Sequence, residues 1–184
     1  MPVSNRVEIK RALDIGAVGV MCPSISTVEE AREAAKACRY PGKGGVRGMA
    51  PTIVRAADWG RDWQGYIQRS NEQVLTIVQI ETREGVENAA AIAAVEGVDM
   101  LFIGPMDLSG DLGRTGNPDH DDVQQAIRRV EQATRGAGKL LGAVPTGAHS
   151  ARALLDRSYD LVIPDVDTLL LRDGARASLA ALRA

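Results

Sequence analysis

Two short apolar runs, each followed at once by polar residues, constrain the fold of this chain most. Residues 74–78 are Val-Leu-Thr-Ile-Val and lead into Gln79 and Glu81, while residues 100–103 lead into the segment that holds Asp107. Such runs are typical of strands that are buried on both faces of a parallel sheet. Because ligands bind at the carboxyl ends of strands in α/β folds, we expect a site where these two runs end.

The rest of the chain alternates strand-like and helix-like segments. We predict strands at residues 17–21, 46–49, 74–81, 100–104, 140–144 and 160–163, and helices at 7–15, 27–38, 66–71, 85–95, 119–136, 148–157 and from about 168 onward. This alternation predicts a parallel sheet with crossover helices. No linker or fixed-period repeat interrupts it, so residues 1–184 are predicted to form a single domain.

Two local patterns add detail. Thr27 and Glu30 form a capping-box pattern, which predicts the start of the helix at 27–38. Trp59 and Trp63 lie four residues apart in the least periodic stretch, residues 51–73. They either cover a site or a subunit contact, or pack in the core.

Composition narrows the class of protein. The formal net charge is −2, so nothing steers the chain toward nucleic acid or an anionic membrane. No apolar run reaches the ~18 residues of a membrane span, and the first residues lack the apolar core of a signal peptide. Cys22 and Cys38 make a poor disulfide framework, which favours a cytoplasmic protein with reduced, buried thiols.

The polar residues at the two strand ends have the chemistry of a cation site. Glu81 and Asp107 should face each other across the mouths of adjacent strands. Gln79 lies two residues before Glu81, so both side chains should point to the same side of the strand. Two carboxylates are the hard oxygen ligands that a divalent cation needs. The alternative is that they cap helices and bind nothing.

These residues also resemble a known family. The motifs are Gln79-Ile80-Glu81-Thr82, the sequence FIGPMDLS at residues 102–109, and Gly116-Asn117-Pro118. They are similar to the metal-dependent class II pyruvate aldolases of the 4-hydroxy-2-oxoheptanedioate aldolase family, whose relatives include 2-dehydro-3-deoxyglucarate aldolase. The resemblance extends back to residues 39–48 and forward to residues 166–168.

The resemblance implies a (β/α)₈ TIM barrel that is N-terminally incomplete, with about six βα units present. It also implies a homo-oligomer that acts on pyruvate and an aldehyde, with the substrate completing the coordination of the cation. Glu81 and Asp107 would be the protein ligands of Mg²⁺ or Mn²⁺, with Co²⁺ or Zn²⁺ also possible. Gln79, Glu81 and Asp107 would be the catalytic residues. Substrate binding is assigned to Gln79, Gly104, Pro105, Met106 and Asp107, with backbone N–H groups of residues 104–107 receiving a carboxylate oxygen of pyruvate.

The reaction implied is aldol cleavage of a 4-hydroxy-2-oxo acid, or its reverse, through a pyruvate enolate that the cation stabilises. No Schiff-base lysine is required, and none is placed for it. All four lysines, namely Lys10, Lys36, Lys43 and Lys139, fall outside the predicted strands.

Three departures from the family pattern alter this expectation. Met1 stands where the family has a catalytic Arg before a Pro, and Asp165 stands where many members have Gly. The family's His–Asp proton-transfer pair lies on strands that precede the matched region. We therefore expect the metal and pyruvate half of the site without the general acid–base half. For this chain alone we expect negligible turnover, and either association through open sheet edges or marginal stability.

Two other functions stay open. One is an acyl-CoA lyase of the citrate lyase β-subunit type, and the other is a non-catalytic remnant that binds 2-oxo acids or only assembles with a partner. Arg47 either holds a buried ion pair or reaches a substrate carboxylate. Asp167 either caps the last helix or anchors a loop. His120 is predicted to lie at the surface, and His149 lies either at the surface or near the site.

Overall fold

The computed structural model describes residues 5–42, 44–147 and 149–183, which build a curved parallel sheet of five strands. The strands are β1 (Gly19–Cys22), β2 (Leu75–Ile80), β3 (Met100–Ile103), β4 (Leu140–Ala143) and β5 (Leu161–Val162). The helices are α1 (Arg6–Asp14), α2 (Val28–Cys38), the 3₁₀ turn η1 (Arg55–Gly60), α3 (Trp63–Gln73), α4 (Arg83–Ala93), α5 (Pro105–Asp111), α6 (Asp121–Gly136), α7 (Ala151–Asp156) and α8 (Asp167–Ala181).

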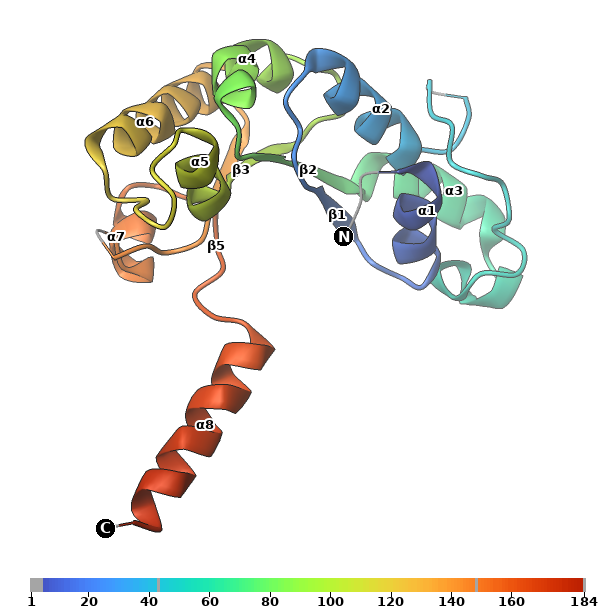
Figure 1. The fold of residues 1–184 in the computed structure, drawn as a ribbon. Helices are drawn as coiled ribbons and strands as arrows, with labels where there is room; N and C mark the ends of the chain where they lie inside the picture. Colours follow the sequence, from blue (N-terminus) through green and yellow to red (C-terminus); the bar gives the residue numbers. More distant parts are fainter. Residues whose placement is uncertain (1–4, 43, 148, 184) are drawn as a thin grey trace.

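The spatial order of the strands equals their order in the chain. Each crossover helix therefore adds the next strand on the same side, and the sheet curls into a half-barrel. Helices α2, α4 and α6 cover its convex face, whereas α8 projects away from the body (Figure 1).

Helix starts follow from short polar side chains. The Thr27 hydroxyl accepts from the Glu30 amide at 3.2 Å and the Glu30 carboxylate binds back, so the predicted capping box is confirmed. Thr82 caps α4 in the same manner, accepting from the Gly85 amide at 3.0 Å. Because α4 begins at this cap, β2 must end just before it, and Glu81 is left between strand and helix.

The two faces of the sheet carry different cores. The convex face packs against the helices through a large aliphatic cluster that includes Val78, Ile80 and Leu101. The concave face has a smaller cluster of Ile77, Met100 and Phe102. Side chains alternate along a strand, so Gln79 and Glu81 lie on the concave side, beyond Ile77.

One predicted strand is wrong. Residues 46–49 form an extended loop, because the Val46 amide donates to Lys36 O at 2.9 Å and the Arg47 amide to Arg39 O at 2.9 Å. These amides satisfy carbonyl groups in the last turn of α2 and just after it, so they do not pair with a strand of the sheet. The described chain therefore holds five strand–helix units instead of about six.

Two further expectations are corrected. The stretch between the predicted strand at 100–104 and the predicted helix at 119–136 contains an unpredicted helix, α5, which begins with Pro105 at a position where its missing N–H costs nothing. Trp59 and Trp63 are both exposed, so the core-packing alternative for them is wrong.

Across the described residues, none of the helices combines the length and apolar character needed to cross a bilayer.

Candidate metal and substrate site

Glu81 is a buried carboxylate that is only half satisfied. It follows β2 and is 6% exposed. Its Oε1 atom accepts two hydrogen bonds, from the Ser24 amide and the Ser24 hydroxyl, each 2.8 Å long. Its Oε2 atom is buried without a hydrogen-bond partner among the described residues. A buried carboxylate oxygen without a partner is costly, so this atom points to a missing ligand.

Gly104 lets the strand ends approach each other closely. An ideal Cβ on Gly104 would lie 2.5 Å from Glu81 Oε2 and 2.8 Å from Gln79 Nε2. Both side chains thus reach over the same glycine, which confirms that Gln79 and Glu81 share one side of β2. The absent side chain at position 104 leaves the space in which Oε2 lies.

Charge at the site is concentrated on two acids. Burial raises the pKa of the Glu81 carboxyl above its ordinary value, the Ser24 hydrogen bonds oppose this, and the neighbouring Asp107 carboxyl raises the pKa further. The direction of the net shift is upward. Asp107 itself is exposed in the first turn of α5. A buried carboxyl group whose charged form is disfavoured by a neighbouring carboxyl group is a setting in which a bound cation is stabilising.

The donor set fits a hard divalent cation. In the described parts of the chain, no three His, Cys, Asp or Glu side chains come together, so the protein could offer two carboxylates only. Mg²⁺ is commonly held by one or two carboxylates, with water and substrate oxygens filling the other positions. Two carboxylates, those of Glu81 and Asp107, therefore suffice for Mg²⁺, whereas a cation that needs three or four protein ligands would not be satisfied here.

A known sequence family matches most of the chain. The HpcH/HpaI aldolase/citrate lyase family matches residues 2–173 of the chain. The chain belongs to this family. The chain thus comes from a family of aldolases and citrate lyases.

Several relatives are close enough to compare in detail. A 4-hydroxy-2-oxo-heptane-1,7-dioate aldolase from Shigella sonnei is 42% identical over 177 residues, which are 96% of this chain and 67% of that protein. A hydroxypyruvate/pyruvate aldolase from Delftia acidovorans is 44% identical over 180 residues, 98% of this chain and 66% of that protein. The crystal structure of a family member from Burkholderia cenocepacia J2315 has a TM-score of 0.90 at 38% identity and covers 100% of this chain and 72% of that one. The chain thus spans about two thirds of the length of the curated relatives that it matches.

The backbone of the HpcH/HpaI-family motif at residues 104–107 offers fewer donors than the sequence suggests. The Gly104 amide already donates to Ile80 O at 3.1 Å, and Pro105 has no N–H. Met106 and Asp107 lie in the first turn of α5, where amides have no intrahelical acceptor. Of the expected carboxylate-binding amides, these two remain available to a ligand.

The two histidines form hydrogen bonds with residues other than Glu81 and Asp107. His120 is the N-cap of α6 and its Nδ1 accepts from the Asp122 amide at 3.2 Å, as its place at a helix start predicted. His149 is half-buried, with Nε2 lying 3.3 Å from Gln124 Oε1. Both histidines are half-buried, so the expected surface position is only partly right for each of them.

Acids and lysines in the remaining motifs act locally. Asp167 is the first residue of α8, not its cap, and accepts from the Thr168 amide at 2.8 Å. Asp165 accepts from the Val166 amide at 2.8 Å. No lysine of the described residues lies in a strand, which agrees with a site without a Schiff base. Met1 and Lys43 lie outside the described residues.

Arg47 has a structural role at the opposite end of the sheet. Its side chain is 1% exposed, and its guanidinium donates to Asp14 at 2.8 Å and to Tyr66 at 3.0 Å and lies 4.3 Å from the centre of the Tyr40 ring. Asp14 ends α1, just before β1, so this cluster lies near the amino ends of the strands. The ion-pair alternative for Arg47 is confirmed.

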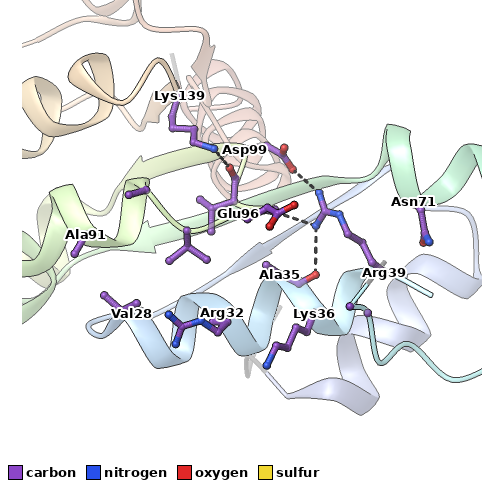
Figure 2. A pocket seen from close by; sticks show the side chains of 16 residues that line it. Val28, Arg32, Ala35, Lys36, Arg39, Asn71, Ala91, Glu96, Asp99 and Lys139 are labelled. Carbon is purple, nitrogen blue, oxygen red and sulfur yellow. Dashed lines mark hydrogen bonds and ion pairs between the residues drawn. The ribbon is translucent and has the colours of Figure 1, made fainter. Parts of the chain in front are cut away.

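A groove lined by cationic side chains lies apart from the carboxylate pair. This groove has a volume of about 800 Å³ and lies between α2, α4 and the segment that leads into β3, with four cationic side chains along it (Figure 2). Arg39 donates to Gly97 O at 2.9 Å and pairs with Asp99 at 3.5 Å, while Lys139 donates to Val98 O at 2.7 Å. Because Arg39 and Lys139 hold the loops between elements, we place the chemistry at the carboxylates of Glu81 and Asp107 instead.

Sequence reasoning missed one residue of the site, Ser24. The signal was available, because Ser24 follows an apolar run that ends at Cys22 and Pro23, as Glu81 follows the run at 74–78. A serine in that place has many ordinary roles, and only the fold brings it to Glu81.

Proposed function

We propose that this chain carries the metal- and pyruvate-binding part of a class II aldolase that cleaves or forms 4-hydroxy-2-oxo acids. In this proposal Glu81 and Asp107 hold Mg²⁺ or Mn²⁺, and Gln79, Gly104, Pro105, Met106 and Asp107 line the pyruvate site. The names of the curated relatives, which are aldolases for 4-hydroxy-2-oxo-heptane-1,7-dioate and for hydroxypyruvate and pyruvate, support the reaction class.

One observation carries the proposal. Glu81 Oε2 is buried, has no hydrogen-bond partner among the described residues, and lies beside Asp107 and Gln79 at the carboxyl ends of β2 and β3. A solvated helix cap would not leave such an atom, because caps are satisfied by the amides that they bind. A carboxylate that is placed to bind a cation would leave one oxygen without a hydrogen-bond partner in this way.

The residues of the chain would divide the work at this site. A bound divalent cation would supply Lewis-acid stabilisation of the negative charge that develops on a substrate oxygen during C–C cleavage. The Gln79 amide would donate a hydrogen bond to substrate or water over Gly104, and the Met106 and Asp107 amides would receive the carboxylate of pyruvate. The apolar cluster of Ile77, Met100 and Phe102, which lies next to the site on the concave face of the sheet, would exclude water from that side of the site.

The test is a titration of the protein with pyruvate, with Mn²⁺ or with excess EDTA, together with an assay of pyruvate release from 4-hydroxy-2-oxo acids. We expect pyruvate binding that needs the metal, and competition from oxalate, which resembles the enolate. From this chain alone we expect negligible release, as the sequence predicts. Pyruvate binding that stays equally tight in EDTA would contradict the proposal.

The two rivals make different predictions in the same assay. An acyl-CoA lyase would release acetyl-CoA from a CoA thioester and leave 4-hydroxy-2-oxo acids intact. The cationic groove cannot serve a CoA tail at this site, because it lies at the other end of the sheet. A non-catalytic remnant that only assembles with a partner would bind neither pyruvate nor the metal.

We also propose that copies of this chain associate. Helix α8 has no buried residue and exposes a row of leucines, and Ile53 and Trp59 are exposed elsewhere. Apolar side chains exposed in such numbers mark interaction surfaces. Light scattering of the purified protein tests this, since a monodisperse monomer would contradict it.

The closed (β/α)₈ barrel, the single domain and the cytoplasmic location stay predictions from the sequence.

A further inference from the structure

The loop that follows β1 reaches across to the end of β2 and binds it with consecutive donors. The Ser24 amide and hydroxyl both donate to Glu81 Oε1, and the next amide, that of Ile25, donates to Gln79 O at 3.1 Å. Ile25 is buried in the main core, which fixes the loop from below. The carboxylate of Glu81 is therefore held from a different strand–helix unit than its own.

Ser24 adopts a backbone conformation that serines rarely take. Its φ is 54°, in the left-handed region that favours glycine. Strained backbone of this kind persists only where the surroundings determine it, and it concentrates at functional sites. Here the turn at Ser24 directs both of its donors to the same carboxylate oxygen.

As a result, the two carboxylate oxygens of Glu81 differ in how available they are to a cation. Oε1 is occupied by two donors, so it is a poor metal ligand. Oε2 is left without a partner and lies over Gly104, beside Gln79 and Asp107. Ligand groups that are oriented by neighbouring hydrogen bonds bind metals more tightly, because the geometry does not need to be found during binding.

We propose that Ser24 is a positioning residue that orients Glu81, so that Oε2 alone is presented to the cation. This inference rests on the proposed metal site and adds a residue to it. Ser24 itself touches neither cation nor substrate in this assignment, and acts through Glu81.

The test compares Mn²⁺ affinity, followed by the electron paramagnetic resonance signal of free Mn²⁺, in the parent protein and in Ser24→Gly. Glycine keeps the backbone donor and adopts the left-handed conformation without strain, so stability to urea should be unchanged or slightly higher. Loss of the hydroxyl should raise the Kd for Mn²⁺ roughly tenfold, the lower end of what removal of an outer hydrogen-bond partner costs. A purely structural serine would not separate affinity from stability in this way.

A matched control lies two residues further along. Ser26 donates to or accepts from Thr82 with 2.6 Å between the hydroxyl oxygens and does not contact Glu81. Ser26→Ala should keep the Kd within about twofold. A change in Ser26→Ala as large as that in Ser24→Gly, or no change in Ser24→Gly, would overturn the inference.

Two further variants separate this inference from the proposed function. Glu81→Gln and Asp107→Asn should each remove most Mn²⁺ binding, and adding Ser24→Gly to Glu81→Gln should have no further effect. If the single acid variants bind as the parent does, or if the parent binds no Mn²⁺ at millimolar concentration, the metal site itself is wrong. If they lose binding and Ser24→Gly does not, only the role of Ser24 is wrong.

Discussion

A methyl group on Gly104 would lie 2.5 Å from Oε2 of Glu81, closer than any real contact of a Cβ atom. The backbone at Gly104 has a φ of −101°, which an alanine can adopt, so the glycine is required by space and not by conformation. The residue that follows β3 thus defines the room in which the carboxylate that follows β2 lies.

Gly104→Ala should therefore weaken metal binding while the fold persists. The new methyl group would push Glu81 and Gln79 aside, and we expect a loss of metal affinity of roughly tenfold with a destabilisation of about 1–3 kcal/mol. Isothermal titration with Mn²⁺ and urea unfolding measure the two effects. Gly110→Ala is the control, because its Cβ would meet nothing within 4 Å, and it should bind as the parent does.

Asp107→Asn should remove most Mg²⁺ or Mn²⁺ affinity without loss of stability. Asp107 is exposed, so its carboxylate contributes charge to the site and little to the packing. Calorimetric titration decides the matter. Asp111→Asn, on the same helix, should leave metal binding intact, since Asp111 accepts from the Arg83 amide instead. Unchanged binding in Asp107→Asn would remove this residue from the site.

The raised pKa of Glu81 predicts how the metal-free protein responds to pH. Folding makes this carboxyl hold its proton more tightly than the unfolded chain does, so stability falls as pH rises from the ordinary glutamate value through the raised pKa. Glu81→Gln removes this dependence. The variant should be more stable than the parent at neutral pH, and the difference should vanish below about pH 4.

Urea unfolding in EDTA across this pH range measures the effect. Glu87→Gln, an exposed position on α4, is the control and should follow the parent at every pH. A Glu81→Gln variant that is less stable than the parent at pH 7 would show that the charged carboxylate is favourable in the metal-free fold.

Arg47→Ala should destabilise the fold by about 2–5 kcal/mol, because it removes a large buried side chain and its ion pair with Asp14, which keeps only Lys10 as a cationic partner. Arg47→Lys should recover only part of this loss, since an ammonium group does not reproduce the planar contacts with Asp14, Tyr66 and the Tyr40 ring.

Urea unfolding at pH 7 gives the values. Arg61→Ala removes an exposed arginine that lies 3.4 Å from Asp58, and it should change stability by less than about 1 kcal/mol. Loss of metal affinity in folded Arg47→Lys would place Arg47 in the site and contradict its structural role.

The local sequence determined the elements that depend on local interactions. The pair Thr27 and Glu30 begins α2 because both groups that satisfy its first amides lie within one turn. The runs before Glu81 and Asp107 became adjacent parallel strands because their apolar residues need burial on both faces. The meeting of these two acids at one sheet edge followed from that alternation alone, and the family motifs named the chemistry.

The tertiary structure decided what depends on distant partners. Residues 46–49 have the composition of a strand, yet their amides satisfy the end of α2, and no local pattern reveals that competition. The exposure of Trp59 and Trp63 was equally hidden, since the same aromatic spacing serves a core or a surface. Ser24 and Glu81 lie 57 positions apart in the chain, and only the pairing of β1 with β2 brings the serine donors to the carboxylate. Which oxygen of Glu81 stays free is thus a property of the fold, because it is set by a contact between two strand–helix units.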